Sequence, residues 1–426
     1  MGSLSKPELL VPAGSLEVLK TAVLYGADAV YIGGEAYSLR AKAKNFSFDD
    51  MAQGIEYAHA HGVKVYVTAN IYAHNSDIDD ASDYFEKLKD IHPDAILISD
   101  PGIFMIQREV CPEIPVHIST QANNTNYRAF EFWHEQGAER VVCARELTLS
   151  EIKELRDRIP SGMEIECFVH GAMCISYSGR CLLSSYMTGR SANLGECTHP
   201  CRWKYAVMEE MRPGEYLPIE ENDRGTFIFN SKDLCMIGHI PEMIDAGINS
   251  FKIEGRMKTA LYVATVARTY RRAIDDYCTS PDLYVKNMEW YLSEIGKCTY
   301  RQFTTGFYFG KPDESSQIYD NSTYVVESIF LGIIEEVTED GRIRLTQKNK
   351  FCVNDEIEIM KPDGRNIAVR VAKIESEDGV SQMSAPHACQ VIYVTLEDAD
   401  GRIAGSECCV GDILRTDARS DEQERA

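Results

Sequence analysis

The sequence predicts an α/β fold, a (β/α)8 barrel of the TIM type, followed by a small all-β barrel. Over the first 255 residues, eight short β-rich runs alternate with helical patterns. Continuous apolar strands separated by single helices indicate a parallel sheet, and eight such units close naturally into a barrel. An open doubly wound sheet is the alternative, but no GxGxxG motif opens any of the expected helices.

The eight expected barrel strands are short and are bounded by polar or glycine-containing segments. In chain order they cover residues 8–12, 29–33, 64–70, 95–100, 116–120, 140–145, 164–170 and 250–254. Between them, segments such as SLEVLKTAVLYGA and LTLSEIKELRDRI repeat apolar residues at spacings of three and four. This period is typical of amphipathic helices that cover a sheet.

The seventh unit is irregular, because about eighty residues separate its strand from the last one. We expect a catalytic barrel over residues 1–310, with a cysteine-rich insertion after strand 7 at about 171–249 and a helical extension at about 258–300. The loops that follow the strands of such a barrel build its active site at the C-terminal face. The insertion is therefore expected to lie over the mouth of the barrel.

The C-terminal part of the chain has a different pattern. From about residue 331, short alternating strands are separated by Asp-Gly dipeptides at 340–341, 363–364 and 400–401, which are hairpin signals. We expect a connector and a small β-barrel domain over residues 311–416. Residues 417–426 are strongly charged and are expected to be a disordered tail.

The composition favours a cytoplasmic protein. The N-terminal stretch MGSLSKPELLVPAG contains no apolar run that would serve as a signal peptide, and no segment approaches the length of a membrane span. Fourteen cysteines without an export signal indicate a reducing compartment rather than a disulfide scaffold.

The net charge of -22 at pH 7 argues against a chain that attracts nucleic acid over its whole surface. Basic residues are nevertheless concentrated in the run Lys252–Arg272, which holds six basic side chains and one acid. A second basic group surrounds the cysteines and consists of Arg180, Arg190, Arg202 and Lys204. An acidic body with such a basic face can bind an anion, whereas the alternative is that these arginines cover a helix surface.

The most informative feature is a group of cysteines within the insertion. Cys174, Cys181, Cys197 and Cys235 are separated by six, fifteen and thirty-seven residues, and Cys201 is a fifth candidate. Soft thiolate ligands select zinc or iron–sulfur clusters. No CxxC pair of the common zinc arrangement is present, so the spacing favours an iron–sulfur cluster. Zinc and inert buried thiols are the alternatives.

The stretch ECFVHGAMCISYSGRCLLS at 166–184 resembles the signature of peptidase family U32, the collagenase-like proteases. The segments ELLVPAG, GECTHPCRWKY, SKDLC and FKIEGRMK agree with that family, so the resemblance covers nearly the whole chain. Within the family, the sequence is most similar to the bacterial members that hydroxylate tRNA.

This resemblance implies an oxygen-independent hydroxylation that forms 5-hydroxyuridine at the wobble position of tRNA. It implies a [4Fe–4S] cluster as cofactor, prephenate as the small dicarboxylate co-substrate, and tRNA as a partner, with a paralogous subunit or a homo-oligomer left open and no role for a membrane. Mapped onto the motifs, the cluster ligands are Cys174, Cys181, Cys197 and Cys235, with Cys201 as the alternative fourth ligand.

Two other classes of function stay open. Proteolysis needs a nucleophile with a base, a carboxylate dyad or a metal-activated water, and the sequence contains neither GxSxG nor HExxH. A dyad of Cys174 and His170 would require Cys174 to serve as a nucleophile and as a cluster ligand. The third class is a non-catalytic RNA-binding module that uses the C-terminal barrel.

Three residues are expected to act in catalysis. His170 and Glu254 end barrel strands, where side chains point toward the catalytic face. His170 could shuttle a proton, because the imidazole pKa lies near neutrality. Arg180 lies between the first two cysteines and offers a guanidinium beside the cofactor.

Five further residues are expected to bind substrate. A dicarboxylate favours the bidentate fork of a guanidinium, for which Arg145 and Arg256 are candidates besides Arg180. Asn70 and Gln121 follow two other strands, and Lys252 opens the basic run.

Overall fold

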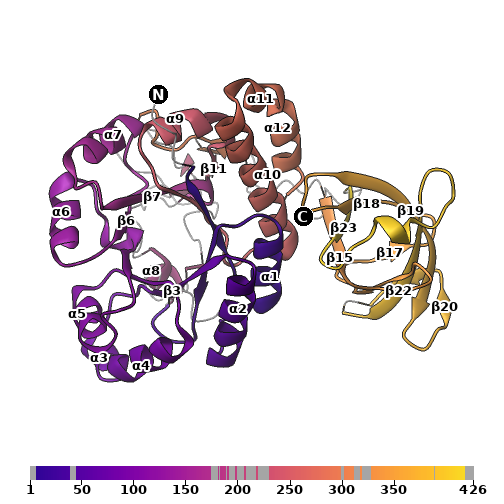
Figure 1. The fold of residues 1–426 in the computed structure, drawn as a ribbon, viewed down its shortest axis with the longest axis horizontal. Coiled ribbons are helices and arrows are strands. Elements are labelled where there is room, and N and C mark those ends of the chain that lie inside the picture. The colour runs from indigo at the N-terminus through magenta and orange to yellow at the C-terminus, as the bar shows by residue number, and fades with distance from the viewer. Residues whose placement is uncertain are drawn as a thin grey trace.

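The computed structural model describes residues 6–38, 45–173, 181, 183–188, 190, 197–198, 206–207, 217–218, 230–298, 302–310, 317–318, 328–387 and 389–417. In these residues the chain forms a closed parallel barrel wrapped by helices and an antiparallel sheet domain beside it (Figure 1).

Eight parallel strands close the first domain into a barrel. They are β1 (Glu8–Pro12), β2 (Ala29–Gly33), β3 (Lys64–Ala69), β4 (Ala95–Ile98), β5 (Val116–Ile118), β6 (Arg140–Val142), β7 (Glu164–Gly171) and β12 (Ser250–Ile253). The last strand, β12, pairs in parallel with both β7 and β1 and so closes the ring. The predicted (β/α)8 barrel is confirmed.

Helices cover the outside of the barrel (Figure 1). They are α1 (Leu16–Leu24), α2 (Phe48–Ala60), α3 (Asn75–Ile78), α4 (Ala81–Ile91), α5 (Pro101–Val110), α6 (Tyr127–Glu135), α7 (Leu149–Arg158), α9 (Ile240–Asp245) and α10 (Ala260–Thr279). Capping residues determine where several helices begin. The Ser15 side chain accepts the Val18 N–H at the start of α1, and Thr148 and Glu151 form a capping box at the start of α7. The apolar faces of these helices pack on the strands in one continuous core.

The cysteine-rich insertion occupies the chain between β7 and β12, as predicted. Its described elements are α8 (Leu183–Thr188), β8 (Ala206–Val207), β9 (Leu217–Pro218), β10 (Asn230–Ser231), β11 (Asp233–Cys235) and the 3₁₀ helix η4 (Ile237–His239). Strand β11 pairs antiparallel with the end of β7, beyond the point where β6 stops, and β13 (Phe303–Thr304) extends this edge. The insertion thus rejoins the barrel at the C-terminal ends of the strands.

The C-terminal domain is a seven-stranded antiparallel sheet with its own core. Its strands are β15 (Ser328–Val337), β16 (Ile343–Thr346), β18 (Glu356–Met360), β19 (Asn366–Ser376), β20 (Ser381–Gln382), β22 (Val391–Glu397) and β23 (Ile413–Asp417). Pairing of β18 with both β19 and β23 closes the sheet into a small barrel, which confirms the predicted all-β fold. Shorter pieces are β14 (Gln317–Ile318), β17 (Phe351–Cys352), β21 (Ser384–Ala385) and the 3₁₀ helix η6 (Ala404–Glu407).

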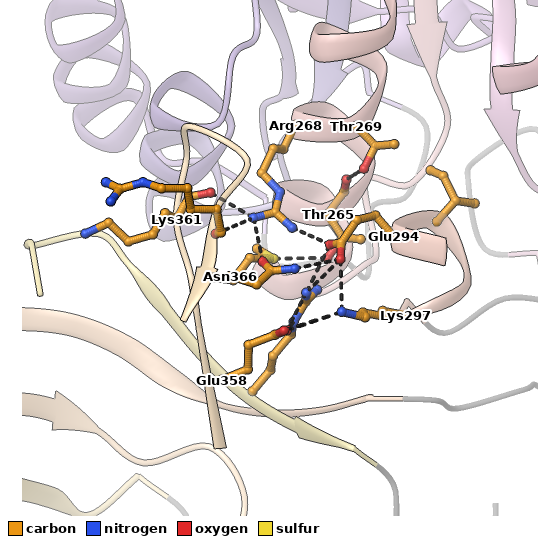
Figure 2. Close-up of polar contacts among 12 residues, drawn as sticks. Thr265, Arg268, Thr269, Glu294, Lys297, Glu358, Lys361 and Asn366 are labelled. Atoms are coloured by element: carbon orange, nitrogen blue, oxygen red, sulfur yellow. Dashed lines mark hydrogen bonds and ion pairs between the residues drawn. The ribbon is translucent and has the colours of Figure 1, made fainter. Parts of the chain in front are cut away.

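The two domains meet along α10 and α12 (Met288–Gly296), and the short helix α11 (Pro281–Lys286) lies between these two helices in the chain (Figure 1). At the centre of this contact the Glu294 carboxylate accepts hydrogen bonds from Arg415 at 3.0 Å, from Asn366 at 2.7 Å and from Arg268 (Figure 2). Burial alone would raise the pKa of Glu294, but the charges of Arg415 and Arg268 outweigh it and lower the pKa to about 2. The domain contact is therefore built around a buried carboxylate held in its charged form.

None of the described helices is both long enough and apolar enough to cross a membrane.

Candidate active site

An ion pair between Arg145 and Glu254 lies at the C-terminal end of the barrel. Arg145 follows β6 and Glu254 follows β12, and their Nη2 and Oε2 atoms are 3.6 Å apart. The guanidinium lies 3.9 Å from the ring centroid of Phe168 and donates to the carbonyl of Ala172 at 3.0 Å. Gly171 allows the close approach, because its φ is +109° and a Cβ there would lie 2.5 Å from the Glu254 carbonyl oxygen. Two predicted site residues are thus brought together.

The carboxamides of Asn70 and Gln121 form a second polar group, at the ends of β3 and β5. Asn70 Nδ2 donates to Ser119 Oγ at 3.1 Å, and the same hydroxyl accepts the Gln121 backbone N–H at 3.5 Å. Asn70 Oδ1 and Gln121 Oε1 are buried and have no hydrogen-bond partner among the described residues. An orphaned buried acceptor costs ~1–3 kcal/mol, so two of them on residues that share a contact with Ser119 mark a place where a ligand can bind.

Arg256 is buried against the ends of β2 and β3. Its Nη1 donates to Ser38 Oγ at 2.7 Å and to Thr68 Oγ1 at 3.0 Å. A Cβ at Gly33 would lie 2.4 Å from this nitrogen, so glycine is required for the guanidinium to pass. The side chain is therefore fixed by hydroxyl groups of the barrel, and its contact with substrate stays a prediction.

Lys252 lies inside the barrel, below the strand ends. Its Nζ donates to Glu166 Oε1 at 2.7 Å and lies 4.4 Å from the ring centroid of Tyr31. Glu166 also contacts Arg140 at 3.2 Å, which in turn pairs with Glu8. Lys252 belongs to an ion-pair network of the barrel interior, and its predicted role in substrate binding is untested.

His170 is fully buried and lies beside Cys235. The two residues are paired across β7 and β11, and the Tyr270 hydroxyl lies 3.4 Å from His170 Nδ1 and 3.9 Å from Cys235 Sγ. The His170 ring packs against Tyr262 and Tyr270 of α10 and against Phe303, on the outer side of the barrel wall. Burial and the charge of Lys258 lower the pKa of His170 to about 3, so its imidazole is neutral at pH 7.

Three of the predicted cluster ligands, Cys181, Cys197 and Cys235, are half-buried thiols, whereas Cys174 and Cys201 lie outside the described residues, as does Arg180. The backbone N–H of Thr198, the residue after Cys197, donates to Ser184 Oγ of α8 at 3.1 Å. Ser184 itself lies three residues after Cys181. Strand β11 ends at Cys235 and pairs with Gly171, three residues before Cys174.

Within the described part of the chain, no three ligand side chains gather as a metal site. The donor set nevertheless fits a soft metal cofactor, because thiolates are soft ligands and Cys235 lies on β11 beside the end of β7. Burial raises the pKa of the Cys235 thiol to about 11, so binding a metal there must displace its proton.

The prediction that Lys252–Arg272 forms a basic face is wrong, because most of the charged groups in this run are buried or paired with acids. Arg268 is 2% exposed and contacts Glu294. Arg271 bonds to Asp28 and Asp275, each at 2.6 Å. The run lies in β12 and in α10, which packs between the two domains, and most of its charges are paired with acids of the same chain. Of the second basic group, Arg190 is exposed, and the other three members lie outside the described residues.

Sequence reasoning missed two residues that organise the site. Ser119 connects the Asn70 carboxamide with the backbone N–H of Gln121, and Tyr270 connects His170 with Cys235. The position of Ser119 directly after a predicted strand could have indicated the first role. Tyr270 lies 35 residues after Cys235, and no local pattern indicates that contact.

Comparison with known proteins agrees with this architecture. The model of peptidase family U32 matches residues 14–318, and that of the family's C-terminal domain matches residues 327–415. The chain is 43% identical to tRNA hydroxylation protein P1 of Bacillus subtilis, over 92% of each chain. It is 38% identical to tRNA hydroxylation protein P of Escherichia coli, over 89% of this chain and 92% of that one.

A more distant relative is the 23S rRNA 5-hydroxycytidine synthase of Escherichia coli, which is 36% identical over 63% of this chain and 39% of its own length. Both family models fall on the two domains described above, and together they extend from residue 14 to residue 415. The chain therefore belongs to peptidase family U32.

Proposed function

We propose that this protein hydroxylates RNA, and that its product is 5-hydroxyuridine at the wobble position of tRNA, formed without molecular oxygen. The observation that carries the proposal is the 43% identity to a protein named for tRNA hydroxylation, which extends over 92% of both chains. A tRNA substrate would place the activity in the cytoplasm.

The polar side chains at the C-terminal end of the barrel support a reaction between a small co-substrate and a nucleoside. Arg145 offers a guanidinium for the carboxylate of a co-substrate, for which prephenate is the candidate. Glu254, 3.6 Å from Arg145, holds that guanidinium in place and can exchange with the incoming carboxylate. Asn70 and Gln121 lie on other strand ends and are available to the nucleoside.

A [4Fe–4S] cluster held by Cys174, Cys181, Cys197 and Cys235 is part of the proposal, with Cys201 as the alternative to Cys235. When bound, such a cluster supplies the electron transfer that hydroxylation without molecular oxygen requires. The Cys235 thiol supports it, because β11 pairs with the end of β7 where the insertion rejoins the barrel.

The pairing of His170 with Cys235 does not favour proteolysis. A Cys–His nucleophile needs a thiolate beside an imidazolium, that is, a lowered thiol pKa and a charged histidine. Here burial raises the pKa of Cys235 and lowers that of His170, so both groups are neutral at pH 7.

The proposed activity can be tested with the full chain purified without oxygen. Incubated with prephenate and tRNA that lacks the modification, it should form 5-hydroxyuridine, detected by mass spectrometry of the digested nucleosides. A preparation that carries iron and sulfide but forms no hydroxylated nucleoside, and that cleaves gelatin after chelation of metals, would favour the peptidase instead.

A further inference from the structure

We propose that the carboxamides of Asn70 and Gln121 form a subsite that reads the hydrogen-bond donors of the target uridine. The inference rests on the proposed RNA hydroxylation and names residues that would select its substrate. The Asn70 side chain and the Gln121 backbone N–H both donate to Ser119 Oγ, so the two residues lie within one small region although they follow different strands.

The unsatisfied atoms of Asn70 and Gln121 are both acceptors. Asn70 Oδ1 and Gln121 Oε1 are buried without a partner among the described residues, whereas the Asn70 amide nitrogen is already used by Ser119. A ligand that satisfies them must bring donors. Uridine brings two, the N3–H of the base and the 2′-hydroxyl of the ribose.

The surroundings hold this region rigid. Asn123, in a left-handed conformation with φ +55°, donates from Nδ2 to the Gln121 carbonyl at 2.7 Å and to the Tyr72 hydroxyl at 3.2 Å. A half-buried aromatic ring beside carboxamides is the composition that RNA-binding sites use to stack and read an unpaired base. Ser99 also donates to the Asn70 carbonyl at 2.9 Å, which fixes that strand end.

The acceptors also exclude other ligands. N3-methyluridine has no N–H at that position, and 2′-deoxyuridine has no 2′-hydroxyl. Each would leave one buried oxygen unsatisfied, and loss of one such hydrogen bond weakens binding about tenfold. The subsite therefore gives selectivity for an unmodified ribonucleotide.

The test uses fluorescence anisotropy with the full chain and an anticodon stem–loop RNA that carries uridine, N3-methyluridine or 2′-deoxyuridine at the wobble position. Wild type should bind each of the two altered RNAs about tenfold more weakly than the uridine RNA. Gln121→Met and Asn70→Leu should each bind the uridine RNA about tenfold more weakly and lose sensitivity to one of the two alterations. Gln136→Met, on an exposed carboxamide at the end of α6, should bind like wild type.

Thermal unfolding separates this role from a structural one. Replacement of the orphaned Gln121 carboxamide by a methionine of similar shape should leave the Tm unchanged or raise it. Equal binding of the three RNAs by wild type, or a Gln121→Met variant that retains full discrimination, would overturn the subsite. If discrimination holds but no hydroxylated product forms, the subsite stands and the proposed reaction fails; product without discrimination refutes the subsite alone.

Discussion

The guanidinium of Arg145 lies 3.6 Å from the carboxylate of Glu254, although their strands β6 and β12 are separated in the barrel by β7. The pair spans the end of β7, where the chain enters the cysteine-rich insertion. Because both side chains are largely buried, at 9% and 15% exposure, an anion that reaches Arg145 meets a guanidinium in a region with little water.

Arg145→Lys should lower kcat/KM for prephenate at least tenfold, mainly through a higher KM, because an ammonium keeps the charge but loses the bidentate fork. Product formation at varied prephenate and fixed tRNA measures this effect. Arg128→Lys is the matched control, since the Arg128 side chain is 77% exposed on α6. Unchanged kinetics in Arg145→Lys would remove Arg145 from the co-substrate site.

Cys235→Ser should lose most of the iron and sulfide bound by the wild-type chain, which is expected to hold about four of each, the composition of a [4Fe–4S] cluster. Iron and sulfide analysis after anaerobic purification gives the answer, with Cys389→Ser, on an exposed thiol of the C-terminal domain, as control. If Cys235→Ser keeps its iron while Cys201→Ser loses it, Cys201 is the fourth ligand. Stoichiometric zinc without sulfide in wild type would reject the cluster.

Glu294→Gln should destabilise the chain by ~3–5 kcal/mol, because it leaves Arg268 and Arg415 buried without their common carboxylate (Figure 2). Urea unfolding measures the loss. Glu131→Gln, in a surface pair with Arg128, should cost less than ~1 kcal/mol. Equal effects of the two substitutions would show that the domain contact does not depend on this ion cluster.

The same carboxylate should make the domain contact sensitive to acid. The pKa of Glu294 is about 2 in the folded chain and 4.5 in the unfolded chain. Its contribution to the free energy of unfolding is therefore complete above about pH 4.5 and is lost as the pH falls toward 2. Wild type should therefore lose stability more steeply over this range than Glu294→Gln. Parallel pH profiles for the two proteins, from urea unfolding, would contradict the assignment.

Much of the barrel could be predicted from sequence, because buried parallel strands are short apolar runs that need no knowledge of distant partners. The expected strands at 8–12 and 29–33 have the bounds observed for β1 and β2. Strand β5 ends at Ile118 rather than at residue 120, because the Ser119 side chain caps a 3₁₀ turn, η1 (Thr120–Ala122).

The orientation of His170 could not be predicted in the same way. Strict alternation from Glu166 and Phe168, which face the barrel interior, would turn His170 inward too. A register shift between β7 and β12 interrupts the alternation, since Lys252 pairs with Phe168 but Ile253 pairs with His170. Such an irregularity turns the side chain to the other face, toward α10.

The charge pattern of the sequence led to the wrong prediction of a basic face for a related reason. The acids that neutralise the basic run are distant in sequence, such as Asp28 for Arg271 and Glu294 for Arg268. A count of charges along the chain cannot reveal such pairs. The orphaned carboxamide oxygens of Asn70 and Gln121 likewise become visible only when the packing around them is known.

The most direct test of the proposed function is mass spectrometry of tRNA nucleosides from a strain that lacks this gene. The strain should lose 5-hydroxyuridine and the nucleosides derived from it. Wild-type protein should restore them, and Cys174→Ala should not. An unchanged nucleoside profile in the deletion strain, with no other gene supplying the modification, would contradict tRNA hydroxylation as the function of this protein.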